Sequence, residues 1–339
     1  MRKLSAGFTS MRIKAITAAG LMAAMMLLQS APVAAQTKIR IGRTVGASGF
    51  HLPSYVAADK GIFKDEGLAP EFIAAEGGVL VRAGIAKEID YVPIPGGGTI
   101  AMLRGAPLLY VVGQSLISQW TITATREIKR VEDLKGKTIG LGRPGSADYE
   151  EATIVLGRFL KMELGKDYKV ISFAGEPDRI AGMIGGSIDA AILSFPHAAA
   201  AEARGFHVVL RTAEYLPRLG GTFFVHRDRI KERRDEVKRF IRAIARAADY
   251  IKTNKKGTVE VIQEWFGIKD INVAEGVYKQ VQNAFGPEIP NDLLRILVES
   301  RATPEAGWPA GKLLPDIEQF VARDLLNEVL KEMGRKVSK

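Results

Sequence analysis

The sequence predicts an α/β protein made of two similar lobes. One run occurs twice, as residues 83–105 (AGIAKEIDYVPIPGGGTIAMLRG) and as residues 181–205 (AGMIGGSIDAAILSFPHAAAAEARG). Each copy shows the end of a helix, an Ile-Asp turn, a short apolar strand, a break of small residues, a second helix and an Arg-Gly stop. Two such units direct strand ends and helix N-termini toward a shared crevice, where open α/β sheets bind ligands.

The two copies align only with a one-residue slip. The pattern is compatible with a true duplication and with two α/β units that acquired similar turn and stop residues independently. Either origin predicts two α/β layers. A mature chain of about 300 residues is also long enough for two domains. We therefore expect a two-lobed ligand clamp.

The first lobe opens with a strand at residues 38–43 (KIRIGR), where apolar and polar residues alternate. A Gly-rich loop at 44–53 then leads into a helix that ends at Ala58. Short apolar runs and helical spacing predict the remaining elements: a strand at 68–74, a helix at 79–86, and strands at 91–94 and 107–112.

The second lobe is predicted inside the chain, at residues 123–222, so that the first lobe comprises 36–122 and 223–339. It opens at 131–140 (VEDLKGKTIG). Its expected elements are a helix at 149–164, a strand at 168–173, a helix at 178–184, the second copy of the repeat and a strand at 208–211. Two strand-like segments flank the insert and are the expected crossings, 119–125 (QWTITAT) and 222–227 (TFFVHR).

The chain from Ile230 onward reads as amphipathic helix, with further helices expected at 273–285, 291–300 and 315–333. Its most basic part, residues 227–256, carries apolar residues at helical spacing and basic residues on the other side. Either a solvated helix face or a surface for an anionic partner fits this pattern.

The N-terminus predicts export. Four basic residues precede an apolar stretch at 15–28, and Val33-Ala34-Ala35 offers small residues before a cut, so residues 1–35 read as a signal peptide removed after Ala35. A membrane anchor is the alternative, but it needs about 20 apolar residues. No Cys follows the apolar run, which excludes a lipid-anchored mature form and a disulfide.

The charge and the motifs argue against a nucleic-acid partner, a cofactor, a metal site and catalysis. The net charge of +10 falls to +6 without the signal segment. This mild basic excess does not indicate a nucleic-acid-binding protein. The string Gly140-Leu141-Gly142-Arg143-Pro144-Gly145 fits G-x-G-x-x-G, but the following strand carries no acid for a ribose. We expect no cofactor. With no close His pair, no G-x-S-x-G and no Cys, we also expect neither a metal site nor an enzyme.

Four helix starts are candidate anion sites, because glycines let backbone N–H groups approach a ligand there. They lie at 46–51, 96–99, 145–146 and 194–197. Each N-terminus favours an anion by about 0.3 to 1 kcal/mol, whereas a micromolar ligand needs about 8 kcal/mol. Apolar and aromatic walls are expected to supply the balance, from Phe50, Tyr149 and Phe195, although each of these also fits a core position.

Several of these segments together resemble a family of periplasmic substrate-binding proteins. They are HLPSYVAADKGIFKDEG (51–67), residues 84–90, VEDLKGKTIG (131–140), Pro144-Gly145-Ser146 and GSIDAAILSFP (186–196). That family serves ABC importers of the nitrate, sulfonate and taurine type and includes binders of pyrimidine precursors. The likeness covers roughly residues 38–222.

The resemblance implies a type II periplasmic binding protein fold, in which two α/β lobes joined by two hinge strands close over one small ligand. It also implies a periplasmic monomer that delivers its ligand to an ABC permease in the inner membrane. The ligand contacts carried over from the family are Ser48, Phe50, His51, Gly97, Gly98, Thr99, Gly145, Ser146, Tyr149, Phe195 and His197.

The bare Gly97-Gly98 pair and the bulky Phe195 and His197 favour an organic anion, a sulfonate or carboxylate with an apolar or aromatic body, over inorganic nitrate. Arg43 and Arg143 are candidate counter-ions. Two alternatives stay open. One is an enzyme, dehydratase-like or pyrimidine-related, that uses His51 with Glu150. The other is a ligand-sensing subunit.

Overall fold

A computed structural model describes residues 36–304, 306–335 and 337 of the 339-residue chain. The predicted signal segment, residues 1–35, lies outside the described residues. From Thr37 onward the chain forms one unit.

The first lobe holds two pairs of strands and five short helical segments. The strands pair parallel as β1 (Thr37–Thr44) with β2 (Leu68–Ala75), and antiparallel as β3 (Leu108–Gly113) with β9 (Thr222–His226). The helical segments are η1 (Gly49–His51), α2 (Leu52–Asp59), α3 (Ile62–Asp65), α4 (Gly77–Ile85) and α5 (Pro95–Leu103). Helix α4 begins two residues before the predicted helix at 79–86, at a pair of glycines.

The predicted strand at 91–94 is wrong beyond its first two residues. Tyr91 and Val92 form single bridges, to β1 and β9 respectively, and so join the two strand pairs. The next residues include Pro93 and Pro95, which have no N–H group to donate to a ladder. The chain therefore leaves the sheet and enters α5 with Pro95 in its first turn.

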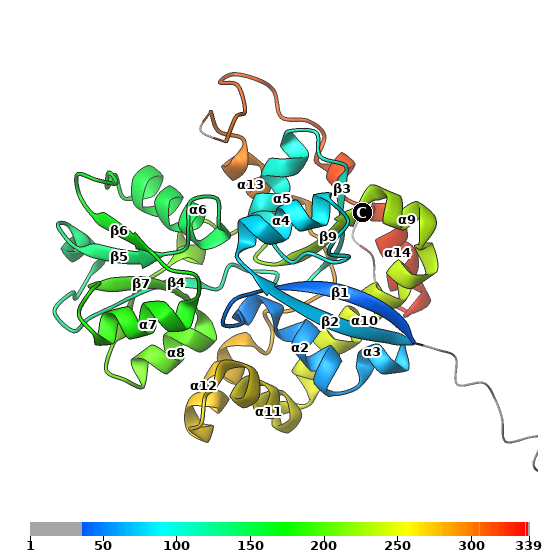
Figure 1. The fold of residues 1–339 in the computed structure, drawn as a ribbon, viewed down its shortest axis with the longest axis horizontal. Helices are drawn as coiled ribbons and strands as arrows, with labels where there is room; N and C mark the ends of the chain where they lie inside the picture. The colour runs from blue at the N-terminus through cyan, green and yellow to red at the C-terminus, as the bar shows by residue number, and fades with distance from the viewer. Residues whose placement is uncertain (1–35, 305, 336, 338–339) are drawn as a thin grey trace, which may run out of the picture. The chain divides into compact units, whose positions relative to one another are not determined.

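The second lobe is a five-stranded sheet in the order β6-β5-β7-β4-β8. Its strands are β4 (Trp120–Ala124), β5 (Thr138–Leu141), β6 (Lys169–Ser172), β7 (Ala190–Ser194) and β8 (His207–Arg211). A 3-10 turn, η2 (Val131–Leu134), precedes β5, and another, η4 (Thr212–Glu214), follows β8. Figure 1 shows α6 (Ala147–Ile154) on one side of this sheet and α7 (Glu176–Ile184) and α8 (Phe195–Glu202) on the other.

The predicted helix at 149–164 is too long at its C-terminal end. Helix α6 passes into a π-helical turn, η3 (Val155–Phe159), where Leu160 N donates to Val155 O over five residues. Lys161 then takes a left-handed conformation, with φ at 55°, which no helix continues through. The helical path therefore stops at about Leu160.

The two copies of the repeated run share the turn at their aspartate, although only the second copy continues into a full strand, β7. Asp90 N donates to Arg40 O at 3.0 Å, and Asp90 Oδ2 accepts from Arg40 N at 2.7 Å. Asp189 forms the same reciprocal pair with Thr138, at 2.9 and 2.8 Å. In each half the aspartate thus fixes a parallel strand, β1 or β5, beside the repeat.

Two short segments connect the lobes and are bonded to each other. Gln114 N and Ser115 N both donate to Gly221 O, and Ser115 O accepts from the N–H groups of Gly220 and Gly221. Strands β4 and β9, the expected crossings, each pair within one sheet instead, β4 in the second and β9 in the first. The predicted boundary at residue 122 falls inside β4. The exact limits of the two lobes stay a prediction.

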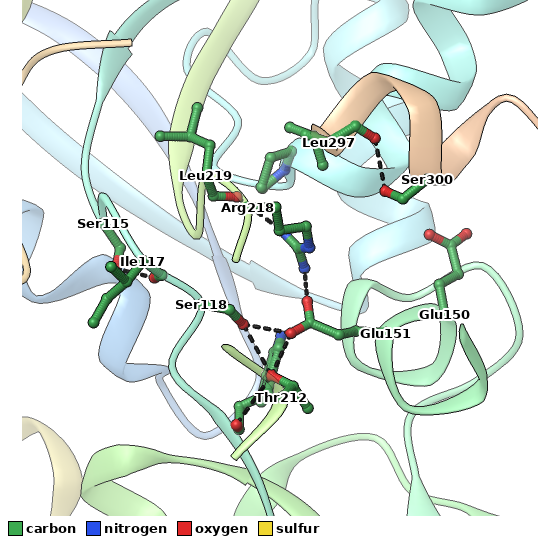
Figure 2. A network of polar contacts seen from close by, with 12 residues as sticks. Ser115, Ile117, Ser118, Glu150, Glu151, Thr212, Arg218, Leu219, Leu297 and Ser300 are labelled. Atoms are coloured by element: carbon green, nitrogen blue, oxygen red, sulfur yellow. Dashed lines mark hydrogen bonds and ion pairs between the residues drawn. The ribbon is translucent and has the colours of Figure 1, made fainter. Parts of the chain in front are cut away.

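A buried carboxylate on α6 holds these connections. Glu151 accepts hydrogen bonds from Ser118 and Thr212 and pairs with Arg218, and Arg218 also donates to Leu219 O at 2.8 Å. Figure 2 shows the Glu151 carboxylate among these groups, whereas neighbouring Glu150 points away on the side of Ser300. Helix α6 is thereby fixed to both segments that lead into and out of the second lobe.

Seven helical segments complete the first lobe. They are α9 (Arg227–Glu232), α10 (Arg234–Thr253), α11 (Lys255–Phe266), α12 (Ile271–Val281), α13 (Asn291–Arg301), η5 (Ile317–Phe320) and α14 (Arg323–Glu332). The apolar face of α10 is buried as predicted, and its basic side chains pair within the chain with Glu66, Glu328 and Glu332. Helix α13 packs beside α5 (Figure 1). Across the described residues, no helix combines the length and apolar character needed to cross a membrane.

Candidate functional site

A cavity of about 260 Å³ lies where the two lobes face each other, and we call it the cleft cavity. Its walls come from the loop after β1, the start of α4 and the 93–95 segment in the first lobe. In the second lobe they come from the loop after β5, the start of α6 and the start of α7. Equivalent parts of the two repeated halves therefore meet at this cavity.

The first-lobe wall offers hydrogen-bond donors that the protein does not use. Thr44 Oγ1 and Ser48 Oγ are buried and have no partner among the described residues, and Ser48 is only 2% exposed. Beside them Gly77, Gly78 and Val79 form the first turn of α4, whose N-cap side chain makes no capping bond. The first-turn N–H groups of a helix have no acceptor within it, so this wall suits an anion.

The second-lobe wall carries two carboxylates, and the first-lobe wall carries one, Glu76 at the N-cap of α4. Asp148 accepts from Gly142 N at 2.7 Å and pairs with Arg179 at 2.6 Å. Glu176 accepts from both N and Oγ of Ser194, at 2.6 and 2.8 Å, at the start of α8. Carboxylates of the chain itself thus already lie at the G-x-G loop and at the start of α8. Anion binding at these two places stays a prediction.

His51 lines the cleft cavity as an uncharged group. Burial lowers the pKa of His51 to about 4; contact with the Pro93 carbonyl opposes this shift and the positive charge of Arg43 adds to it. The ring lies 3.4 Å from the Tyr55 hydroxyl through Nδ1. At neutral pH His51 therefore offers a hydrogen bond but no charge.

Aromatic and charged groups complete the cleft cavity. Phe50 and Trp120 line it with ring centroids 4.9 Å apart. Arg143 and Glu76, on opposite lobes, form an ion pair of 3.4 Å at an exposed position. The lining contains three arginines and three carboxylates, so these charges cancel.

The structure brings four of the eleven predicted ligand residues to the cleft cavity, namely Ser48, Phe50, His51 and Ser146. Three others, Gly97, Gly145 and Tyr149, line a neighbouring cavity. The remaining four, Gly98, Thr99, Phe195 and His197, line neither of these two.

Those four residues have other contacts in this structure. A Cβ on Gly98 would lie 2.7 Å from the Phe224 ring, and the Thr99 hydroxyl contacts Pro95 O at 2.9 Å and the Tyr110 hydroxyl at 2.7 Å. Phe195 is buried in the hydrophobic core built mainly by the first lobe. His197 Nε2 lies 3.3 Å from Ala47 O on the other lobe. Their contact with a ligand stays a prediction.

Several residues of the cleft cavity were not predicted from the sequence. Gly77 and Gly78 carried a usable signal, because a glycine pair follows a strand and opens a helix. Asp148, Arg179 and Trp120 carried none, since only the fold brings these distant positions together. Of the two candidate counter-ions Arg143 lines the cavity, whereas Arg43 lies 5.9 Å from the Trp265 ring centroid and outside the lining.

Among the residues that the structure describes, no three His, Cys, Asp or Glu side chains are grouped to hold a metal ion. The proposed catalytic pair is not assembled in one cavity either. His51 lines the cleft cavity, whereas Glu150 lines the neighbouring one and pairs with Arg301 at 2.9 Å.

We compared the chain with known protein families and sequences. A family model described as NMT1/THI5 like matches residues 49–257. The chain belongs to the NMT1/THI5-like family. No curated protein sequence matches it.

Solved structures show which fold this family member has. The chain is similar to the periplasmic nitrate-binding protein NrtA from Synechocystis PCC 6803, with 16% identity and a TM-score of 0.71 over 88% of this chain and 89% of that chain. It is also similar to the alkanesulfonate-binding protein SsuA from Xanthomonas axonopodis pv. citri bound to MOPS, with 19% identity and a TM-score of 0.65 over 84% and 95%. The predicted type II periplasmic binding protein fold is thus confirmed.

An enzyme has this fold as well. The desulfurization enzyme DszB matches with 16% identity and a TM-score of 0.61 over 88% of this chain and 100% of that chain. The fold is therefore compatible with binding alone and with catalysis. Only the residues of the cleft can distinguish the two functions.

Proposed function

We propose that this protein is the substrate-binding component of an ABC importer, and that it binds a small organic anion in the cleft cavity. The observation that carries the proposal is the pair of buried hydroxyls of Thr44 and Ser48, which lack partners among the described residues beside the open N-terminus of α4. Buried polar groups are nearly always hydrogen-bonded, so hydroxyls without a protein partner beside a cavity support a bound acceptor, either a ligand or a water molecule.

The cavity also supports the class of ligand. At about 260 Å³ it falls slightly below the range of drug-sized sites, which favours a small molecule. Phe50 and Trp120 give the same cavity an apolar surface. An inorganic anion would leave that surface unused, so we infer a sulfonate or carboxylate with an apolar or aromatic body.

Ligand capture would proceed by hinge closure. Contacts between the lobes support this, because Gly49 N lies 3.3 Å from Ser194 Oγ and His197 Nε2 lies 3.3 Å from Ala47 O. The paired connections at Ser115 and Gly221 form the hinge in this proposal. Closure would bury the ligand and form the surface that an inner-membrane permease recognises.

The same proposal includes location and state. Residues 1–35 would be removed as a signal peptide, and the mature chain would act in the periplasm as a monomer without a cofactor. Its relatives in fold are named as periplasmic binding proteins, which supports this location. A ligand-sensing role would use the same cleft. Finding a permease gene adjacent to this one would favour transport over sensing.

A thermal-shift screen of the purified chain tests the binding function. The chain is first unfolded and refolded to remove carried-over ligand, then mixed with benzenesulfonate, taurine, benzoate, a pyrimidine or nitrate. A ligand that binds only the native state raises its stability by RT ln(1 + [L]/Kd). We expect a shift with organic sulfonates or carboxylates and none with nitrate, and the absence of any shift would contradict the proposal.

Catalysis is the second candidate, because DszB shows that the fold accommodates it. It predicts that bound ligand is chemically altered during incubation. We expect ligand recovered from the protein by denaturation to be unchanged by mass spectrometry, whereas a stoichiometric or catalytic product would establish an enzyme.

A further inference from the structure

A second and larger cavity lies next to the cleft cavity, and we call it the α13 cavity. Its volume is about 1250 Å³, and its walls come from α4, α5, α6 and the C-terminal end of α13. It shares only Gly78, Arg82 and Pro144 with the cleft cavity, so these three residues form the partition between the two.

The lining of the α13 cavity is strongly basic. Among the described residues it contains Arg82, Arg104, Arg158 and Arg301 against a single carboxylate, Glu150. The cleft cavity has equal numbers of the two charges. Two of these arginines, Arg82 and Arg158, are exposed and form no ion pair with a described residue. An excess of guanidinium groups in one concavity attracts negative charge.

Arg301 is the most informative of these residues, because it is 2% exposed and incompletely paired. Its Nε lies 2.9 Å from Glu150 Oε2 without hydrogen-bond geometry, and one terminal nitrogen donates to Ser300 Oγ at 3.3 Å. The other terminal nitrogen has no partner among the described residues. Glu150 offsets the charge of this buried guanidinium, but the unused N–H donors of Arg301 still carry a desolvation cost until they find an acceptor.

The position of Arg301 adds to that cost. A Cβ on Gly96 would lie 3.1 Å from Arg301 Nε, so the guanidinium is held against the first turn of α5. A helix N-terminus is positive, and a cation there is unfavourable. Burial, and then repulsion by Arg218, lower the pKa of Arg301 to about 10, which leaves it charged at neutral pH.

We propose that the α13 cavity is a second anion-binding site, distinct from the cleft cavity, for an organic dianion of the phosphomonoester class. Among the described lining residues four guanidinium groups face one carboxylate, which favours a doubly charged group over a sulfonate or carboxylate. Guanidinium groups match phosphate oxygens in paired hydrogen bonds. The volume and the apolar side chains of Val81, Ile100 and Ile154 accommodate an organic body.

The test is calorimetric titration of the purified chain with phenyl phosphate, benzenesulfonate and inorganic phosphate. It uses the Val79→Trp variant, in which a half-exposed residue of the cleft cavity is enlarged to block that cavity. We expect phenyl phosphate to bind at least about tenfold more tightly than the other two, because only it combines two charges with a ring.

Two variants of the α13 cavity and one control give the decision. Arg158→Glu and Thr153→Trp are expected to weaken phenyl phosphate binding by about tenfold or more, through charge and through volume. Arg295→Glu changes the same charge on the exposed face of α13, outside the cavity, and is expected to leave binding unchanged.

Three results would overturn the proposal: equal affinity for phenyl phosphate and benzenesulfonate, an equal loss in all three variants, or loss of binding in Val79→Trp while the unmodified chain binds. The last result would place the phosphate in the cleft. The first two results concern the α13 cavity alone, and the third would show only that the cleft cavity accepts a phosphate. The proposal that the cleft cavity binds an organic sulfonate or carboxylate is tested separately, by its own titration.

Discussion

At the scale of single residues, two hydroxyls that look alike in the sequence have different surroundings. Ser48 and Thr99 both follow glycines at a helix start and were both predicted to contact ligand. Ser48 Oγ has no partner among the described residues, whereas the Thr99 hydroxyl is already bonded to Pro95 and Tyr110. Only the first therefore has capacity left for a ligand.

Substitution separates these two roles. Ser48→Ala is expected to weaken ligand binding by about 10- to 100-fold, because a hydrogen bond to a charged acceptor contributes about 1.5–3 kcal/mol. Thr99→Val is expected to lower the free energy of unfolding by about 1–3 kcal/mol and leave affinity unchanged. Calorimetric titration and urea unfolding of both variants provide the readouts. A loss of ligand affinity in Thr99→Val without a loss of stability would show that Thr99 contacts the ligand.

The uncharged state of His51 predicts a pH dependence of stability. Its folded pKa of about 4 lies below the ordinary 6.5, so between these values the unfolded chain binds more protons than the folded one. The stability due to neutral His51 is thus complete above about pH 6.5 and is lost as pH falls toward 4, with a magnitude on the order of 3 kcal/mol.

The comparison of the unmodified chain with His51→Gln measures this effect. Urea unfolding between pH 7 and pH 4 is expected to show a decline in the unmodified chain that the variant lacks over the same interval. Identical pH profiles would mean that His51 titrates normally and is not buried as described.

At the scale of elements, Glu151 links α6 to both connections (Figure 2). Glu151→Ala is expected to lower the free energy of unfolding by about 3–5 kcal/mol, because it leaves the buried Arg218 without its counter-ion. The double variant Glu151→Leu with Arg218→Met removes both charges at similar volume and is expected to recover most of that loss. Urea unfolding measures both. A single variant as stable as the unmodified chain would show that the pair does not hold the hinge.

The elements also show what the sequence can predict. The strands and helices of the repeat were predictable because apolar spacing and Gly stops act locally, and the aspartates at 90 and 189 mark equivalent turns. The errors lie where a local rule was overridden: the prolines after Val92 end a strand, and a π-turn ends α6 early.

The candidate site was predictable only in part. Ser48 and Ser146 could be predicted, because each stands just before a helix start in the loop that follows a strand, β1 or β5. The carboxylates Asp148 and Glu176 were not, since their effect on the second-lobe wall depends on partners such as Arg179 and Ser194 that only the fold supplies.

At the scale of the whole molecule, closure depends on small residues between the lobes. A Cβ on Gly49 would lie 2.6 Å from Pro196 Cδ and 2.8 Å from Gln119 Oε1. Gly49→Ala is thus expected to hold the lobes apart and weaken ligand binding by about tenfold, although it removes no ligand contact.

Small-angle scattering of the ligand-saturated protein provides the readout for Gly49→Ala. The radius of gyration is expected to stay larger in the variant than in the unmodified chain. Gly276→Ala, at a position in α12 with open space around it, serves as the control for a glycine outside the interface. Equal radii with ligand in all three proteins would argue against closure at this contact.

The central claim is that the cleft cavity binds a small organic anion. Its most direct test is calorimetric titration of refolded protein with benzenesulfonate, taurine and benzoate, beside the cavity-blocking variant Val79→Trp. We predict saturable one-to-one binding of at least one of these ligands at about micromolar affinity, abolished in the variant. Failure of all three to bind, or equal binding by the variant, would contradict the assignment of the cleft cavity as the ligand site.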